Sequence, residues 1–373
     1  MSLRLAPLSI PRRLLLGPGP SDVHPDVLAA MSKPVLGHLD PAFLKLMDET
    51  MEALRVVFGT KNEMTLPISG AGSAGMEASL VNLLEPGERV IVGVIGHFGA
   101  RLAEIARRTG AEVETIEPEW GQALDPAEIR RSLQKKKAKV VAIVHVETST
   151  GVVQSIEEIS KIAHENGAFL VVDTVASLGG MPVDVEAMKI DVCYSGSQKC
   201  LSAPPGLAPL TIGEAAMAAV RSRKTKVRSW YLDLSLLNGY WGAERVYHHT
   251  APITMIYALR ESLRLCLEEG LAARYKRHLD VHNAFAAGLS KLGLEFLVPP
   301  ERRAVIVNAV KVPAGVDAGA VRKRLLEEDG IEVAGGLGPF AGKIWRVGFM
   351  GHSAQFENVD RLLSAMKRIL GRS

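Results

Sequence analysis

Short apolar runs alternate with segments of helical periodicity between about residues 40 and 215, and this alternation constrains the fold more than any other feature. The helical segments include Pro41 to Val57 and Ile156 to Glu165. The apolar runs lie at Arg89 to Val94, Val113 to Ile116, Val140 to Val144, Phe169 to Val172, Val192 to Tyr194 and Leu207 to Ile212. Strands of a parallel sheet are covered on both faces and are therefore apolar throughout. The pattern predicts an α/β fold with a mostly parallel sheet between layers of helices.

The pattern changes after Thr250. A long helical stretch runs from Ile253 to Leu292 and is interrupted at Gly270. Shorter strand and helix patterns follow it at Ala304 to Val312, Ala318 to Glu328, Lys343 to Val347 and Glu357 to Ile369. A chain of 373 residues also exceeds the roughly 250 residues at which a single core usually divides. We therefore expect an N-terminal arm over residues 1–14, a large domain over 15–269 and a smaller C-terminal α/β domain over 270–373.

The balance of charge argues against several classes of partner. The 44 basic and 41 acidic side chains give a formal net charge of +3, too small to indicate nucleic acid or an anionic membrane. The three cysteines are widely spaced and odd in number, so they predict neither a disulfide framework nor a zinc site. The adjacent His248 and His249 would point to different sides of any regular element, so no metal is expected there. Met1 to Pro11 contains no apolar run as long as a signal or membrane segment, and we expect a cytoplasmic protein.

Two chemically useful residues follow apolar runs directly. Asp173 closes the run Ala168 to Val172, and Lys199 ends the segment Ser195 to Lys199 after another run. A buried lysine loses its charge more readily than an exposed one, which lets its amine form an imine with an aldehyde. A nearby acid can keep a pyridine nitrogen protonated, and this pairing is what pyridoxal phosphate requires of a protein. The alternative stays open that Asp173 caps a turn and Lys199 lies on the surface.

A glycine-rich segment from Gly70 to Gly75 fits the pattern G-x-G-x-x-G and precedes a helix predicted from Met76. A dinucleotide site would also require an acid at the end of the next strand, and Arg89 to Val94 is followed by none. The exposed N–H groups before a helix suit a single phosphate, such as that of pyridoxal phosphate. A purely structural turn is the other interpretation.

Three further positions carry candidate groups. Phe98 lies in the segment Gly96 to Gly99 and could stack on a heteroaromatic ring or pack in the core. Glu147 to Gly151 offers hydroxyl groups at the same sheet edge, or forms a simple turn. Arg346 lies in a strand pattern among apolar residues, where it requires a carboxylate partner from the substrate or from the protein.

Taken together, the chain resembles the alanine-glyoxylate and serine-pyruvate aminotransferases of class V, within the fold-type I pyridoxal phosphate enzymes, nearly from end to end. The resemblance rests on Pro7 to Pro11, Leu16 to Ser21, Ser149 to Val152, Val175 to Gly180, Ser195 to Lys199, Ala203 to Gly206, Tyr247 to Thr250 and Gly335 to Pro339. It implies a fold-type I transferase with a mostly parallel seven-stranded sheet flanked by helices and a smaller C-terminal α/β domain.

The resemblance also implies roles for residues around the cofactor ring. Lys199 matches the lysine that binds the cofactor covalently, and Asp173 matches the partner of the pyridine nitrogen. Val175 matches the residue under the ring and Phe98 the residue over it, where the family usually has tryptophan. Thr148 matches a hydroxyl position near the ring oxygen.

The remaining matches concern the phosphate and the substrate. Gly72, Ser73 and Gln198 match phosphate-binding positions, and relatives close to the animal enzymes carry histidine at the Ser73 position. Tyr247 and Thr250 match residues that reach the phosphate of the neighbouring subunit, which implies a homodimer with shared sites. The residue that binds the substrate α-carboxylate is matched by Arg346.

The resemblance implies an aminotransferase with ping-pong kinetics that moves an amino group from alanine or serine to glyoxylate or pyruvate. A larger donor such as 3-hydroxykynurenine, or the chemistry of a class V lyase or epimerase, remains an alternative. A cysteine desulfurase is disfavoured because Cys193 and Cys200 flank the lysine motif and Cys266 lies in a helical pattern. The absence of a DNA-binding segment disfavours a regulator that has lost turnover.

Overall fold

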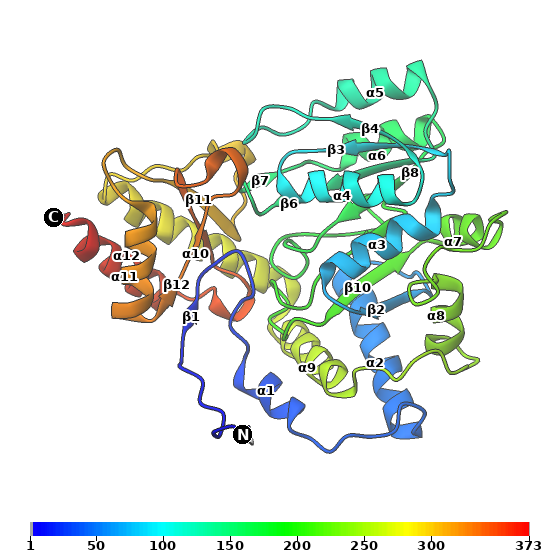
Figure 1. Ribbon diagram of the computed structural model, residues 1–373, viewed down its shortest axis with the longest axis horizontal. Coiled ribbons are helices and arrows are strands. Elements are labelled where there is room, and N and C mark those ends of the chain that lie inside the picture. Colours follow the sequence, from blue (N-terminus) through cyan, green and yellow to red (C-terminus); the bar gives the residue numbers. More distant parts are fainter. Residues whose placement is uncertain (1–2, 373) are drawn as a thin grey trace.

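The main sheet of the computed structural model, which describes residues 3–372, has seven strands (Figure 1). In spatial order they are β2 (Thr65–Ser69), β10 (Leu207–Ile212), β9 (Val192–Tyr194), β8 (Phe169–Asp173), β5 (Val140–Val144), β3 (Arg89–Gly93) and β4 (Glu112–Ile116). Only β10 runs antiparallel to its neighbours. The predicted mostly parallel sheet is confirmed. The strands β3, β4, β5, β8 and β9 run in the same direction, so their carboxyl ends lie at one common edge of the sheet.

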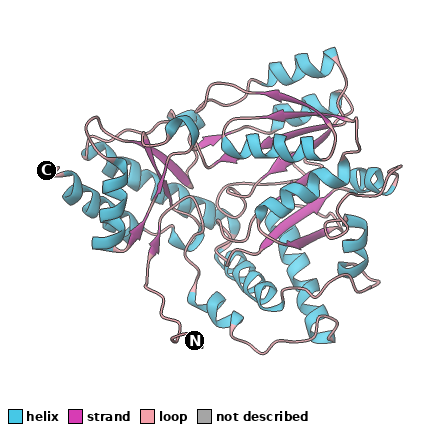
Figure 2. Ribbon diagram, viewed as in Figure 1, coloured by secondary structure: helices cyan, strands magenta, loops and turns pink. Residues whose placement is uncertain are grey.

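Helices enclose this sheet, as Figure 2 shows. They are α1 (Pro25–Met31), α2 (Pro41–Phe58), α3 (Gly72–Leu83), α4 (His97–Arg108), α5 (Pro126–Lys135), α6 (Glu157–Glu165), α7 (Glu214–Arg221), α8 (Leu234–Trp241) and α9 (Ile253–Glu269). The local sequence explains the ends of α2: the Asp40 side chain accepts a hydrogen bond from Ala42 N, and Gly59 takes the left-handed conformation after the last turn. Contacts of α3 with β9 and β10, and of α4 with β3 and β5, bring the starts of both helices to the strand ends.

The C-terminal elements gather on the left of Figure 1 around a small antiparallel sheet. They are α10 (Leu271–Lys291), the 3₁₀ turn η1 (Pro300–Arg302), β11 (Val307–Lys311), α11 (Ala318–Asp329), β12 (Ile331–Glu332), β13 (Ala334–Gly335), η2 (Gly338–Phe340), β14 (Ile344–Gly348), η3 (Gly351–Ser353) and α12 (Phe356–Leu370). The early strand β1 (Leu14–Leu15) pairs with β12, and the hairpin of β6 (Val146–Glu147) and β7 (Val152–Val153) lies at the edge of the main sheet.

Buried side chains form a larger apolar cluster around the main sheet and a second one around α10, β14 and α12. The change from one to the other near residue 270 supports the division that we propose, into 1–14, 15–269 and 270–373. Leu14 and Leu16 pack in the second cluster, because β1 pairs there. None of the helices within residues 3–372 is both long enough and apolar enough to cross a membrane.

Two boundaries differ from the prediction by three residues or more. The helix expected from Met76 begins at Gly72, so the glycine-rich segment forms its first turn. The strand expected from Ala304 begins only at Val307, because the backbone N–H of Ala304 binds Gly151 O instead of joining the small sheet.

Close packing of α3 on the sheet leads to the first prediction. A Cβ at Gly75 would lie 3.1 Å from the Cβ atoms of both Ala208 and Tyr194. Gly75→Leu should therefore push α3 away from the sheet and lower the free energy of unfolding by about 1–3 kcal/mol. Urea unfolding measures this, with Glu77→Leu on the exposed side of the same helix as the control. Equal losses in the two variants would contradict the predicted packing.

Candidate active site

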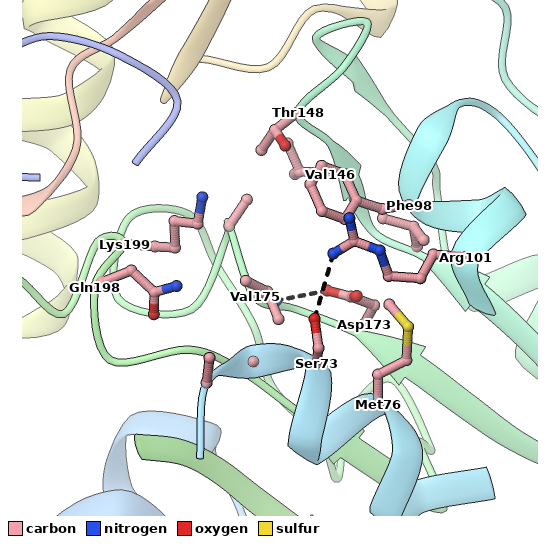
Figure 3. A pocket seen from close by; sticks show the side chains of 14 residues that line it. Ser73, Met76, Phe98, Arg101, Val146, Thr148, Asp173, Val175, Gln198 and Lys199 are labelled. Carbon is pink, nitrogen blue, oxygen red and sulfur yellow. Dashed lines mark hydrogen bonds between the residues drawn. The ribbon is translucent and has the colours of Figure 1, made fainter. Parts of the chain in front are cut away.

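A cavity of about 210 Å³ lies at the common edge of the sheet, beside the starts of α3 and α4 (Figure 3). It is lined by Ala71, Gly72, Ser73, Met76, Phe98, Arg101, Val144, Val146, Thr148, Asp173, Val175, Ala176, Gln198 and Lys199. Eight of the predicted site residues therefore lie around one cavity: Gly72, Ser73, Phe98, Thr148, Asp173, Val175, Gln198 and Lys199. The strand ends account for this, because parallel strands deliver their following residues to one side of a sheet.

Asp173 is the last residue of β8 and is buried. Tyr194 lies opposite it on β9, and its hydroxyl donates to Asp173 Oδ2 at 2.9 Å. The backbone N–H of Val175 donates to Asp173 Oδ1 at 2.8 Å. Burial raises the pKa of the carboxyl group to about 6, although both hydrogen bonds act in the opposite direction. The site thus holds an acid that releases its proton near neutral pH.

Lys199 reaches the cavity from the loop after β9, and its Nζ donates to the carbonyl oxygen of Pro18. Burial lowers the pKa of its amine to about 8, and the charge of Arg346 adds to this effect. Gly19 lies against the same side chain with φ of +103°, and a Cβ there would overlap Lys199. A glycine is therefore required at position 19 for both its conformation and its lack of a side chain.

The start of α3 offers a place for a phosphate. Its N-cap residue, Ala71, provides no side-chain hydrogen bond to the first N–H groups, which stay available for an anion. A Cβ at Gly72 would lie only 3.0 Å from Val175 Cγ2. Gln198 lines the same cavity, and its side-chain NH₂ can donate hydrogen bonds to a phosphate oxygen. These features fit the phosphate end of pyridoxal phosphate.

Glu147 belongs to the segment for which the sequence predicts hydroxyl groups or a simple turn, and in the structure it is fully buried and caps α4. Its Oε2 accepts hydrogen bonds from the N–H groups of Phe98 at 2.9 Å and Gly99 at 3.2 Å. Its Oε1 accepts from the hydroxyl of Ser149 at 2.7 Å. A Cβ at Gly96 would overlap both Glu147 and Ser149. This contact fixes the segment that carries Thr148 against the helix that carries Phe98.

Arg346 lies in β14 and is mostly buried, at the edge of the region but outside the lining of the cavity. Its Nε donates to Gly335 O at 2.7 Å and its Nη1 to Thr148 O at 3.1 Å. Burial lowers the pKa of the guanidinium. It forms no ion pair with a carboxylate of residues 3–372. The carboxylate partner expected from the sequence therefore has to come from elsewhere.

Tyr247 and Thr250 do not join the cavity within one chain. Both are exposed, and Tyr247 contacts the ring of His38 at a centroid distance of 4.9 Å. Within residues 3–372, no three His, Cys, Asp or Glu side chains are close enough together to hold a metal ion.

Sequence reasoning missed two polar residues of the site. Arg101 lines the cavity, where its guanidinium donates to Ser73 Oγ at 3.3 Å and lies 4.9 Å from the centre of the Phe98 ring (Figure 3). The sequence signal for Arg101 was its position one helical turn after His97, which places both side chains on the same face of α4. Tyr194 could have been found because it ends a strand beside Asp173.

The pKa of Asp173 leads to a prediction on the cofactor-free protein. Its value of about 6 in the folded chain lies above the ordinary 3.8, so folding favours the protonated acid. Protonation of Asp173 contributes to the free energy of unfolding. This contribution is fully present below pH 3.8 and is lost as the pH rises through 6. Asp173→Asn should remove this loss, which amounts to about 3 kcal/mol above pH 6.

Urea unfolding at several pH values between about 4 and 6.5 measures the difference from the parent protein. Asp360→Asn, on the exposed side of α12, is the control and should follow the parent. A parent and an Asp173→Asn variant with parallel pH profiles would show that Asp173 is not protonated on folding.

The sheet order, the cavity and the pair of Lys199 and Asp173 define a fold-type I enzyme of the kind that uses pyridoxal phosphate. Comparisons with known proteins identify the family. The sequence profile described as "Aminotransferase class-V" matches residues 14–362, and the chain belongs to this family. Pyridoxal phosphate is its cofactor.

Three relatives illustrate the similarity. The chain is 43% identical over 381 residues to (S)-ureidoglycine–glyoxylate transaminase of Bacillus subtilis (strain 168), covering 97% of this chain and 92% of that protein. It is 42% identical over 369 residues to alanine–glyoxylate aminotransferase of Drosophila melanogaster, with coverages of 98% and 94%. The crystal structure of alanine–glyoxylate aminotransferase from Nostoc sp. has a TM-score of 0.97 and 49% identity, and covers 99% of this chain and 98% of its own. The predicted family and fold class are thus confirmed.

Proposed function

We propose that this aminotransferase moves the amino group of a small amino acid, alanine or serine, to a small oxo acid, glyoxylate or pyruvate. The observation that carries the proposal is the placement of a lysine of lowered pKa and an acid of raised pKa around one cavity, with an arginine at its edge that lacks a protein carboxylate partner. An amine that can shed its proton and a cation that can bind a carboxylate are what an amino-acid substrate requires.

The residues proposed to hold the cofactor line one cavity, which supports their roles. Gly72, Ser73 and Gln198 would bind its phosphate, and Asp173 would keep the pyridine nitrogen protonated. The faces of the ring would contact Phe98 and Val175, and Thr148 would lie near the ring oxygen; all three residues line the same cavity. When bound, pyridoxal phosphate supplies an aldehyde that reacts with amines and a ring that accepts electrons from Cα.

The chain's own groups perform the other tasks. The Lys199 amine, held near Pro18 O and with its pKa lowered to about 8, takes a proton from the substrate Cα and returns it at another carbon. Arg346 would bind the substrate α-carboxylate and so orient the Cα–H bond toward that amine. Tyr194 keeps Asp173 in place through its hydroxyl group. Both half-reactions use the same residues, so the first product has to leave before the second substrate binds. Ping-pong kinetics are therefore expected.

The choice of substrates rests on size and on the relatives. Both relatives named from the sequence comparison act on glyoxylate and differ in their amino donor, according to their names. The cavity of about 210 Å³ has to hold the cofactor as well as the amino donor, so we favour a small donor over 3-hydroxykynurenine. (S)-Ureidoglycine is a second candidate donor, because the Bacillus relative is as similar to this chain as the Drosophila alanine–glyoxylate aminotransferase is.

The buried cysteines disfavour a desulfurase. Cys193, Cys200 and Cys266 are all buried free thiols, and burial raises the pKa of Cys193 and of Cys200 to about 12. A thiol nucleophile requires access and thiolate character. A lyase or epimerase would use the same carboxylate site and is separated by experiment below. Free thiols also support a location in the reducing cytoplasm, which we include in the proposal.

A homodimer is the other part of the proposal. Several large apolar side chains are exposed on the single chain, and burying them at a subunit interface would stabilise a homodimer. They include Leu3, Leu5, Leu8, Ile10, Val35, Trp230 and Tyr247. In a dimer, Tyr247 and Thr250 would complete the phosphate site of the neighbouring subunit. Sedimentation of the purified protein tests this assembly.

A matrix of donors and acceptors tests the reaction. The purified enzyme should convert alanine or serine with glyoxylate or pyruvate, and the cofactor absorbance should fall with the donor and recover with the acceptor. Loss of the α-hydrogen or of a substituent without transfer to an acceptor would establish the lyase or epimerase alternative.

Lys199→Ala should abolish turnover, because Lys199 is the one lysine among the described residues that line the cavity. Borohydride reduction should label the parent at Lys199 and leave the variant unlabelled. Circular dichroism and sedimentation should be the same for both proteins. Turnover by the variant at the rate of the parent would remove Lys199 from the mechanism.

Arg346→Ala should raise the KM for the amino donor by about 30-fold, as expected when a buried carboxylate loses a charged partner worth ~2 kcal/mol. Steady-state kinetics measure the effect. Arg324→Ala is the matched control, because Arg324 is exposed on α11 and pairs only with Glu328. A KM unchanged in the Arg346 variant would exclude the assigned role.

A further inference from the structure

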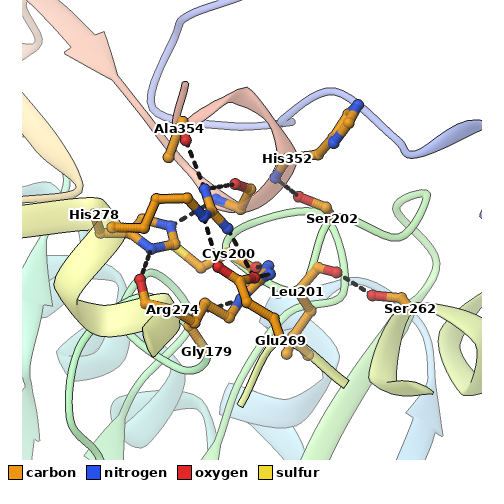
Figure 4. A network of polar contacts seen from close by, with 12 residues as sticks. Gly179, Cys200, Leu201, Ser202, Ser262, Glu269, Arg274, His278, His352 and Ala354 are labelled. Atoms are coloured by element: carbon orange, nitrogen blue, oxygen red, sulfur yellow. Dashed lines mark hydrogen bonds and ion pairs between the residues drawn. The ribbon is translucent and has the colours of Figure 1, made fainter. Parts of the chain in front are cut away.

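A network of charged side chains lies where α9 ends and α10 begins (Figure 4). It lies between the C-terminal elements and the lysine loop, which is the loop after β9 that carries Lys199. Its centre is Glu269, the last residue of α9. Arg274, Arg277 and His278 approach it from α10. None of these residues lines the cavity or takes part in the chemistry described above.

Arg274 connects the network to the lysine loop. Its Nη2 donates to Cys200 O at 2.6 Å and its Nε to Gly179 O at 2.8 Å. Cys200 directly follows Lys199 in the chain. The Arg274 side chain is only 6% exposed, so its geometry is set by these partners. A guanidinium thus holds the backbone next to the reactive amine.

Arg277 and His278 connect the network to the turn that follows β14. Arg277 Nη1 donates to Ala354 O at 2.6 Å and to Gly351 O at 3.0 Å. His278 Nε2 accepts from Gly351 N at 2.9 Å, while its Nδ1 contacts Arg274 O at 2.7 Å. Because Gly351 is five positions beyond Arg346, these contacts act on the strand that carries the substrate arginine.

Glu269 joins the two arginines. Its Oε2 lies 2.6 Å from Arg274 Nη1 and 3.0 Å from Arg277 Nη2, and its Oε1 lies 2.6 Å from Arg277 Nε. Burial by itself would raise the pKa of Glu269, but the hydrogen bonds and charges of Arg277 and Arg274 outweigh it and the pKa is lowered. Charge-assisted contacts of this geometry are strong and directional. The carboxylate therefore fixes the two guanidinium groups relative to each other.

We propose that Glu269 is a positioning residue, which through Arg274 and Arg277 sets the place of Lys199 relative to Arg346. The inference rests on the proposed function, because it assigns these two residues to proton transfer and to carboxylate binding. It goes beyond that function by separating two effects. Arg274 acts on the lysine loop, Arg277 acts on the substrate side, and Glu269 acts on both.

The experiment uses the cofactor-loaded enzyme and three conservative variants: Glu269→Gln, Arg274→Lys and Arg277→Lys. Glu268→Gln is the matched control, since the neighbouring Glu268 is exposed and pairs only with Arg264. The first readout is the pH midpoint of the cofactor–lysine absorbance without substrate. The second is the KM for the amino donor together with the inhibition constant of propionate, which carries a carboxylate and no amine. Thermal unfolding is recorded for every variant.

Arg274→Lys should shift the absorbance midpoint by about one pH unit and leave propionate binding nearly unchanged. Arg277→Lys should weaken propionate binding and raise the donor KM by about tenfold, with the absorbance midpoint of the parent. Glu269→Gln should change both readouts. If Glu269→Gln does not fold or load cofactor, the two lysine variants decide the outcome by themselves.

Variants that retain the parental midpoint, KM and propionate binding would overturn the proposal, even if their thermal stability falls, because the network would then be only structural. Identical changes in the Arg274 and Arg277 variants would overturn it as well. A parent protein without transaminase activity is a different result, since it refutes the proposed function before any variant is compared.

Discussion

Parallel pairing of β8 with β9 is the constraint on which the site depends. It places Asp173 directly opposite Tyr194, and the loop after Tyr194 then needs only five residues to reach Lys199. A separation of 26 positions along the chain thus becomes a short distance across one cavity. A slip of this register would separate Asp173 from Tyr194 and displace the loop that carries Lys199, because the two residues of the pair lie on different strands.

Burial acts on the two reactive groups in opposite chemical directions and brings them to a common range. It raises the pKa of Asp173 to about 6 and lowers that of Lys199 to about 8. One physical cause, the loss of water around a charge, therefore adjusts an acid and a base together. The backbone contributes neutral partners, at Val175 N for the acid and at Pro18 O for the amine. Opposite charges act more weakly than burial, since Lys199 lowers the pKa of Asp173 and Asp173 raises that of Lys199 without reversing either shift.

Much of this arrangement could be predicted from the sequence, because apolar runs identify strands and the residues that follow them are found at one edge. Asp173 and Lys199 were located in this way. Tyr194 and Arg101 were missed although their positions carry a signal, because their roles depend on strand register and on the direction of a helical side chain. The start of α3 at Gly72 was missed because glycine is a poor helix former, whereas contact with Val175 leaves no room for a Cβ.

Glu147 shows a further limit of prediction. A carboxylate within a hydroxyl-rich turn suggests local turn hydrogen bonds, and one of its oxygens does bind Ser149. Its other oxygen caps a helix that begins 50 positions earlier, at His97. Partners so distant in the chain become visible only when the strands have been placed side by side.

The pairing of β1 with β12 has a mechanical consequence. The chain enters the smaller apolar cluster at Leu14, leaves it, and returns after Gly270, so two separate connecting segments link the two clusters. The first connecting segment carries Pro18 and Ser21, and Ser21 Oγ donates to Lys199 O at 2.7 Å. Any rotation of the smaller cluster must bend both connecting segments together. Each segment then transmits the movement to the backbone of Lys199.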